Sequence, residues 1–434
     1  MDLMDVVLSR DNLNRAYKKV KANKGASGVD NQSVEELGGY LKVNGEKVIN
    51  DIRTRKYFPM PVKRVYIPKS NGKKRPLGIP TVLDRMIQQA MAQPITDIYE
   101  QVFSDFSFGF RPGRSCHDAI KQALTYLNDG YEWVIDIDIE QFFDKVNHDK
   151  LIQILREEVN DSDVLNLIRK YLKAGVMEKG IEKATKTGVP QGGPISVILS
   201  NVYLDKLDKE LESRGLRFVR YADDVLIFTR SEVAANRVMD SISSWIERKL
   251  FLKVNATKSK VCRPMRSKYL GFTFLKRDGQ WKVKPTSKSK ARLYEKLRAY
   301  LKRNRAVARS LPTTFKKVNE VVRGWINYYR IGMMKSFMKD FGKWLRHKIR
   351  VIIIKQWKTP KTIYKNLMTL NRKYKNGYSH EDIYKVANTR LGWYRRTRLP
   401  MINFILNPKI LETKIRDRVG LLNPLEYYLR KVGI

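Results

Sequence analysis

The sequence predicts an α+β fold whose first part mixes strands with helices and whose second part is helical. Residues 133–139 alternate between apolar and polar side chains, as a half-buried strand does. Two short apolar runs, 218–221 and 225–228, are joined by three residues, which is a hairpin spacing. Between residues 315 and 329 apolar side chains recur every three or four positions, which indicates one face of an amphipathic helix.

The predicted strands carry carboxylates where they would lie close together. The strand at residues 133–139 places Asp136 and Asp138 on one face, because successive side chains of a strand point to opposite sides. The hairpin places Asp223 and Asp224 between its two apolar strands. Two adjacent aspartates do not both stay ionised at close range without a cation beside them. The alternative is an ordinary polar turn, in which aspartate is common.

Helices are expected after the central strands and through most of the second part. Pro194 should begin one of them, because proline favours the first helical position and apolar residues follow at helical spacing. Residues 290–375 are expected to form several helices, with Gly324 and Gly332 at close packing or helix ends. The last sixty residues show no clear periodicity.

The charge of the chain indicates a polyanionic partner. There are 86 Lys and Arg against 44 Asp and Glu in 434 residues, a formal net charge of +42. A hydrophobic fraction of 42% is enough to bury cores, which excludes a disordered basic tail. Nucleic acid is the expected partner of such a protein. The basic residues become dense from about Lys253 onward.

The composition also restricts the compartment. Cys116 and Cys262 are too few for a disulfide framework or a four-ligand zinc site. No apolar run is long enough to span a membrane, and the first residues lack the basic and apolar regions of a signal peptide. We therefore expect a soluble cytoplasmic protein, without a membrane partner.

Two segments resemble the metal-binding motifs of reverse transcriptases. Residues 221–224 (Tyr-Ala-Asp-Asp) are similar to the Tyr-x-Asp-Asp hairpin of these enzymes. Their other motif is an aspartate followed five residues later by an aromatic. Asp138 meets this spacing with Phe143, whereas Asp136 and Asp144 do not. The resemblance therefore selects Asp138.

Residues 188–196 lie between these motifs and resemble the Pro-Gln-Gly segment that lies beside the incoming nucleotide in the family. The order and spacing of all three segments agree. The resemblance implies that Asp138, Asp223 and Asp224 are catalytic and hold two Mg²⁺ ions, with Mn²⁺ as a possible substitute. Such a pair of ions, roughly 3.5–4 Å apart, stabilises the attacking and leaving oxygens of a phosphoryl transfer.

Further matches imply a set of nucleotide-binding residues. Arg75, with Lys69 upstream, resembles the fingers segment that clasps the triphosphate, where Arg forks to phosphate oxygens and Lys acts as a point charge. Phe143 would exclude a ribose 2′-hydroxyl, although an isolated Phe after a strand is otherwise a core residue. Gln191 would lie beside the nucleotide. Lys258, in an Asn-x-x-Lys-Ser segment, would lie near the catalytic site.

Residues 269–272 resemble the motif that supports the primer end, which implies that Tyr269 and Gly271 lie beside primer and template. Three other segments match the bacterial group II intron-encoded enzymes, also called maturases. They are an N-terminal extension at 23–30, a Gly-Phe-Arg-Pro segment within 108–115, and a thumb signature at 323–329 in which two aromatics are expected to pack in the core.

The resemblance implies a right-hand polymerase. Fingers and palm, with an antiparallel palm sheet, would occupy residues 1–285, a helical thumb or maturase domain 286–375, and a small basic DNA-binding domain 376–434. Its partners would be group II intron RNA, an RNA template with a DNA primer, deoxynucleotides and target DNA. After Trp357 the sequence has no cysteine and one histidine, His380, which implies the type that lacks a nuclease domain.

The predicted function is therefore an RNA-directed DNA polymerase that copies intron RNA into DNA at a new site and assists splicing of that RNA in the bacterial cytoplasm. One alternative is a splicing maturase without polymerase activity, against which the intact aspartates argue. Another is a reverse transcriptase of a different bacterial retroelement, which the maturase-like thumb signature disfavours.

Overall fold

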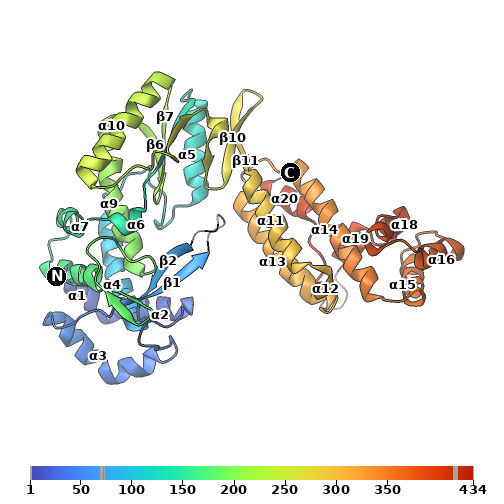
Figure 1. Ribbon diagram of the computed structural model, residues 1–434, viewed down its shortest axis with the longest axis horizontal. Helices are drawn as coiled ribbons and strands as arrows, with labels where there is room; N and C mark the ends of the chain where they lie inside the picture. Colours follow the sequence, from blue (N-terminus) through green and yellow to red (C-terminus); the bar gives the residue numbers. More distant parts are fainter. Residues whose placement is uncertain (1, 69–71, 73, 414–418, 434) are drawn as a thin grey trace. The chain divides into compact units, whose positions relative to one another are not determined.

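The computed structural model describes residues 2–68, 72, 74–413 and 419–433. The chain folds into two compact units, Met1–Ser267 and Lys268–Ile434 (Figure 1). The α+β class, with an antiparallel sheet in the first unit and mostly helices in the second, is confirmed. The limits of the fingers and palm, thumb and C-terminal domains stay predictions.

The helices of the first unit begin mostly at polar capping residues. Ser115, for example, accepts a hydrogen bond from the Asp118 amide, and the Asp118 carboxylate accepts one from the Ser115 amide. The predicted helix at Pro194 is confirmed. In chain order the helices are α1 (Leu3–Leu8), α2 (Arg10–Asn23), α3 (Leu37–Arg53), α4 (Val82–Tyr99), α5 (Cys116–Asn128), α6 (Phe142–Lys145), α7 (His148–Leu155), α8 (Ser162–Lys173), α9 (Pro194–Ser213), α10 (Glu232–Leu250) and the 3₁₀ helix η1 (Pro264–Arg266).

Two four-stranded sheets complete the first unit. One has the order β2-β1-β4-β5, with β1 pairing antiparallel to β2 and parallel to β4. The other has the order β6-β7-β3-β8, and all its pairs are antiparallel. The strands are β1 (Val62–Pro68), β2 (Lys74–Ile79), β3 (Trp133–Asp138), β4 (Val176–Glu178), β5 (Ile181–Lys183), β6 (Arg217–Tyr221), β7 (Asp224–Thr229) and β8 (Lys260–Cys262).

The second sheet contains both strands that the sequence analysis singled out. Ile135 of β3 and Ile227 of β7 pair with each other and are fully buried in the core, which also contains residues of α9 and α10. The hairpin of β6 and β7 is confirmed, but its turn is shorter than expected. Asp224 already belongs to β7 and pairs with Tyr221, so only Ala222 and Asp223 form the turn.

The second unit begins with a small antiparallel sheet of order β11-β10-β9 and continues as helices, as predicted for residues 290–375. No helix among the described residues of the whole chain is long and apolar enough to cross a membrane. The elements of this unit are β9 (Lys268–Tyr269), β10 (Phe272–Arg277), β11 (Gln280–Pro285), α11 (Ser287–Tyr300), α12 (Arg303–Ala306), α13 (Leu311–Tyr329), α14 (Lys335–Gln356), α15 (Pro360–Lys373), α16 (His380–Asn388), α17 (Trp393–Arg396), α18 (Pro400–Ile405), α19 (Pro408–Glu412) and α20 (Pro424–Val432).

The predicted amphipathic helix is α13, and its apolar stripe faces a core shared with α11 and α14. The expectation for Gly324 is wrong. This glycine lies inside α13, and a Cβ built on it meets no described atom within 4 Å apart from its chain neighbours and the backbone of its own helix. Gly332, by contrast, is closely packed, because a Cβ there would lie 3.3 Å from the Val283 carbonyl oxygen.

Candidate active site

The carboxylates selected from the sequence lie at one end of the central sheet of the first unit. Asp138, the last residue of β3, is the register partner of Asp224, the first residue of β7. Asp223 occupies the turn directly before Asp224 and is exposed. Directly opposed residues on antiparallel strands are close neighbours, so the pairing itself places two carboxylates together and a third beside them.

The electrostatics of this end of the sheet show that negative charge is concentrated there. Solvent reaches Asp224 from one side, yet desolvation by the surrounding protein raises the pKa of its carboxyl to about 6, and the like charges of Asp223, Asp136 and Asp138 add to this shift. Desolvation likewise raises the pKa of Asp136 to about 6. Carboxyl groups in this state favour a neighbouring cation.

A cation is already present beside Asp138. The Nζ atom of Lys258 lies 3.0 and 3.1 Å from the two carboxylate oxygens of Asp138. Among the described residues, no three acidic, histidine or cysteine side chains are gathered closely enough to hold a metal ion as they lie. The carboxylate donors nevertheless fit the oxygen preference of Mg²⁺ and Mn²⁺.

A fully buried arginine forms a hydrogen bond to the hairpin turn. Arg220 of β6 donates from Nε to both carboxylate oxygens of Asp208, at 2.7 and 2.9 Å. Its Nη1 donates to Asn201 Oδ1 and to the Ala222 carbonyl oxygen, each at 3.0 Å. Ala222 adopts a left-handed conformation, with φ of 58°, that is unfavourable for a residue with a Cβ. Arg220 therefore fixes the peptide that joins Ala222 to Asp223.

Gly109 packs closely against the same turn. A Cβ on Gly109 would overlap the backbone nitrogen of Ala222. The Gly109 carbonyl oxygen accepts a hydrogen bond of 2.8 Å from Asn201 Nδ2, whose Oδ1 is bound by Arg220. Part of the segment predicted at 108–115 therefore packs directly against the hairpin.

A cavity of about 540 Å³ in the first unit gathers three of the five predicted nucleotide-binding residues. Arg75 and Gln191 line it, and Arg75 Nε donates to Gln191 Oε1 at 2.8 Å. Phe143 also lines it and is half-buried, with its ring edge-to-face against Phe142 at 5.3 Å. Lys69 lies outside the described residues. Lys258 lies at the carboxylates instead.

The backbone explains why Gln191 is held against β2. The amide of Gly78 donates to the Gln191 carbonyl oxygen at 2.8 Å. Gly192 has a φ of 133°, and a Cβ there would overlap the Gly78 carbonyl oxygen, so only glycine fits. Ser196 Oγ donates to the Pro190 carbonyl oxygen at 2.6 Å and fixes the segment to the start of α9.

The cavity also contains residues that the sequence analysis did not assign to it. Phe110 is 52% exposed, and its ring lies 6.4 Å from that of Tyr221, so the cavity reaches the base of the aspartate hairpin. Arg85 of α4 lines the cavity and donates to the Ala26 carbonyl oxygen at 2.6 Å. Lys19 of α2 is a further basic lining residue. Phe110 lay in a recognised segment, whereas the two basic residues lay in none.

Comparison with known proteins agrees with this geometry. Residues 67–274 match the family described as reverse transcriptase (RNA-dependent DNA polymerase), and residues 290–374 match the group II intron, maturase-specific domain. Protein YkfC of Escherichia coli (strain K12) is 33% identical over 299 residues, which are 60% of this chain and 78% of that protein. The chain belongs to the group II intron reverse transcriptase/maturase family.

Other known proteins match parts of this reverse transcriptase. Group II intron-encoded protein LtrA of Lactococcus lactis subsp. cremoris is 40% identical over 208 residues, 47% of this chain but only 34% of LtrA. A solved telomerase of Candida albicans matches with a TM-score of 0.44 and 13% identity, over 80% of this chain and 68% of that one. The family and the predicted class of enzyme, an RNA-directed DNA polymerase with a maturase-specific domain, are confirmed.

The primer-supporting residues predicted for this reverse transcriptase lie in its second unit. Tyr269 is buried, and the turn that follows it consists of Leu270 and Gly271, with φ of 47° and 80°. This is the pattern of a tight two-residue hairpin, which favours glycine at such positions. A Cβ on Gly271 would also lie 2.5 Å from Tyr329 Oη, so a larger residue there needs the Tyr329 side chain to shift.

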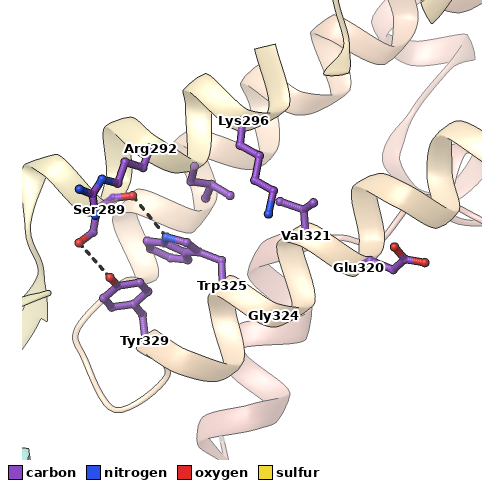
Figure 2. Close-up of a pocket in the computed structure, with 9 residues that line it drawn as sticks. Ser289, Arg292, Lys296, Glu320, Val321, Gly324, Trp325 and Tyr329 are labelled. Carbon is purple, nitrogen blue, oxygen red and sulfur yellow. Dashed lines mark hydrogen bonds between the residues drawn. The ribbon is translucent and has the colours of Figure 1, made fainter. Parts of the chain in front are cut away.

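Two tyrosines of the thumb signature at 323–329 stabilise the turn of Leu270 and Gly271 by hydrogen bonds. Tyr328 Oη donates to the Leu270 carbonyl oxygen at 2.9 Å. Ser289 Oγ donates to the Gly271 carbonyl oxygen at 3.1 Å and accepts a hydrogen bond of 2.9 Å from Tyr329 Oη, one of the bonds drawn in Figure 2. Trp325 and Tyr329 were the two aromatics expected to pack in the core, and Tyr329, together with Tyr328, also fixes the predicted primer-supporting turn.

Proposed function

We propose that this chain is the RNA-directed DNA polymerase of a group II intron, which copies intron RNA into DNA from a primer at a target site and binds the same RNA to assist its splicing. The observation that carries the proposal is the register of Asp138 against Asp224, with Asp223 on the adjoining turn. The reaction is attack of a primer 3′-hydroxyl on the α-phosphorus of a deoxynucleotide, with pyrophosphate as the leaving group.

The three carboxylates are proposed to hold divalent metal ions, on which the family depends in general. Bound there, Mg²⁺ would stabilise negative charge on the attacking and leaving oxygens. The protein contributes the placement of the ligands. Strand pairing fixes Asp138 and Asp224, and the bond from Arg220 to the Ala222 carbonyl oxygen fixes the turn that carries Asp223.

The cavity of the first unit is proposed to hold the incoming deoxynucleotide. Arg75 presents a guanidinium group suited to phosphate oxygens, and its bond to Gln191 sets the orientation of that group. Phe143 lines the same cavity, with its ring buttressed by Phe142, so it is placed to limit the space around the sugar. Lys258 would neutralise charge at the carboxylate end of the sheet.

Replacing Phe143 with Ala tests the sugar assignment. We expect misincorporation of ribonucleotides to rise by about tenfold or more, because the lost ring opens space that a 2′-hydroxyl needs and one steric contact is worth one to a few kcal/mol. Competition between a ribonucleotide and its deoxynucleotide in primer extension measures this ratio. A Phe103→Leu variant, altered at a buried phenylalanine that does not line the cavity, serves as the control. Unchanged discrimination would show that Phe143 is only a packing residue.

The second unit is proposed to bind intron RNA, as the match to the maturase-specific domain implies. Clustered Lys and Arg provide affinity for phosphates without reading sequence. The turn at Gly271 is proposed to support the primer through its backbone, because Tyr269 is buried. Target DNA is proposed as a further partner of the last sixty residues.

Primer extension tests the whole proposal. With an RNA template, an annealed DNA primer, Mg²⁺ and deoxynucleotides, the full chain should extend the primer, and chelation of the metal should stop extension. Absence of extension together with retained binding of group II intron RNA would contradict the polymerase assignment and leave a splicing maturase. A coding sequence outside any intron would instead favour a different retroelement.

A further inference from the structure

A small pocket lies between α11 and α13 of the second unit (Figure 2). Its volume is about 320 Å³. Arg292 and Lys296 form a basic rim, and Trp325 forms an aromatic wall. Glu320 and Gly324 also line the pocket. The pocket is separate from the carboxylates and the nucleotide cavity, which belong to the first unit.

The aromatic wall of the pocket is held in place by its neighbours. Trp325 Nε1 donates to the Ser289 carbonyl oxygen at 3.4 Å, as Figure 2 shows. Its ring also contacts Tyr329, with centroids 4.5 Å apart, and Phe337, at 5.5 Å. A ring already fixed in this way loses little conformational freedom when a second flat group packs on it.

Gly324 keeps the space beside this ring open. It precedes Trp325 in the middle of α13, where glycine is less favourable than almost any other residue. A Cβ built on Gly324 meets no described atom within 4 Å outside its chain neighbours and the backbone of its own helix, so no contact with another element requires a glycine there. Gly324 lowers the stability of α13 and makes no packing contact that requires a glycine. Its presence is explained if a ligand occupies the space beside Trp325.

The charges around the pocket favour an anion with a polar edge. Arg292 and Lys296 stand four residues apart on the exposed side of α11, so both side chains rise from one face. Glu320 of α13 also lines the pocket and is paired with Lys317 at 3.1 Å. Basic groups at the rim suit a phosphate, and a carboxylate can accept hydrogen bonds from a base amino group.

We propose that this pocket binds one unstacked nucleotide of a single-stranded RNA segment, with its base against Trp325 and its phosphate beside Arg292 and Lys296. Unpaired bases splayed onto aromatic rings are a common mode of RNA recognition, whereas a paired base in a duplex has no free face to offer. This proposal rests on the proposed binding of intron RNA by the second unit and adds the site at which an unpaired base is taken.

Photo-crosslinking of the full chain tests the site directly. The probe is a short single-stranded RNA of mixed sequence that carries one 5-iodouridine, and the crosslinked peptide is identified by mass spectrometry. We expect crosslinks at Trp325. A Gly324→Leu variant should reduce their yield by about tenfold, because loss of base stacking on one aromatic ring has an effect of this size. Unlabelled single-stranded RNA should compete, and an RNA duplex of the same length should compete much less.

Matched variants separate pocket filling from other effects. Gly324→Ala raises helix propensity but adds only one methyl group, so crosslinking should persist. Gly45→Leu makes the same change at an open helical glycine of the first unit and should have no effect. Lys296→Gln should lower the yield several-fold, whereas Lys343→Gln, at an exposed site on α14, should not.

The possible results distinguish failure of the pocket proposal from failure of the proposed function. No crosslink at Trp325, equal competition by the duplex, or a yield unaffected by Gly324→Leu would each overturn the pocket proposal. If primer extension and intron RNA binding persist in such a case, only the pocket fails. If the chain shows neither activity, the proposed function fails with it.

Discussion

Replacing Asp223 with Asn should abolish primer extension, with a loss of about a thousandfold or more, while RNA binding stays within about twofold of the wild type. Metal-held charge stabilises a phosphoryl-transfer transition state by several kcal/mol, and each 1.36 kcal/mol is a factor of about ten in rate. Asp223 is exposed on a turn where Asn is equally suited, so the fold should be unaffected. Extension and filter binding on the same RNA measure the two effects.

Asp240→Asn is the matched control, since it removes one exposed carboxylate of the first unit on α10, away from the hairpin. It should leave both extension and binding unchanged. A parallel fall of RNA binding and extension in the Asp223 variant would show that this carboxylate acts on the RNA complex and not on the chemical step.

Replacing Arg220 with Met should destabilise the protein by about 3–5 kcal/mol, because removal of one partner leaves Asp208 as a buried, unpaired carboxylate. Burial already raises the pKa of Asp208, and Arg220 is the main opposing influence. Extension should fall as well, since the Ala222 carbonyl oxygen loses its donor. Denaturant unfolding gives the stability, and primer extension at a temperature where the variant is folded gives the activity.

A double variant distinguishes stability from positioning. Arg220→Met combined with Asp208→Leu replaces the buried pair by apolar groups, which often restores most of the stability. The bond to the Ala222 carbonyl oxygen remains absent, so extension should stay low although the protein is again stable. Full recovery of extension in the double variant would mean that Arg220 serves only the fold.

The sequence was sufficient to locate the strands that carry the candidate carboxylates because the pattern of each strand is local. Alternation predicted the strand that ends at Asp138, and two apolar runs predicted the hairpin. The choice of Asp138 over Asp136 came from the family resemblance, and the structure places Asp138 opposite Asp224. Neither pattern could predict the register of β3 against β7, because these two strands are about ninety residues apart in the sequence.

The supporting residues could not be predicted for a different reason. Arg220 is fully buried, whereas an arginine in a strand normally indicates the solvent face, so its sequence context pointed the wrong way. Arg85 lines the cavity proposed to hold the nucleotide and belongs to a helix that resembles no motif. Gly324 was misread because glycine usually marks a turn or a close contact, and here it marks empty space.

The ion pair between Lys258 and Asp138 means that the carboxylate end of the sheet carries its own counterion. This tethered ammonium group offsets part of the repulsion among the aspartates before any metal binds. Binding of the intron RNA would then not require the metal ion that copying of the RNA requires. Under the proposed function, we expect the protein to remain bound to intron RNA while idle as a polymerase and to begin synthesis only when primer, nucleotide and metal are all present.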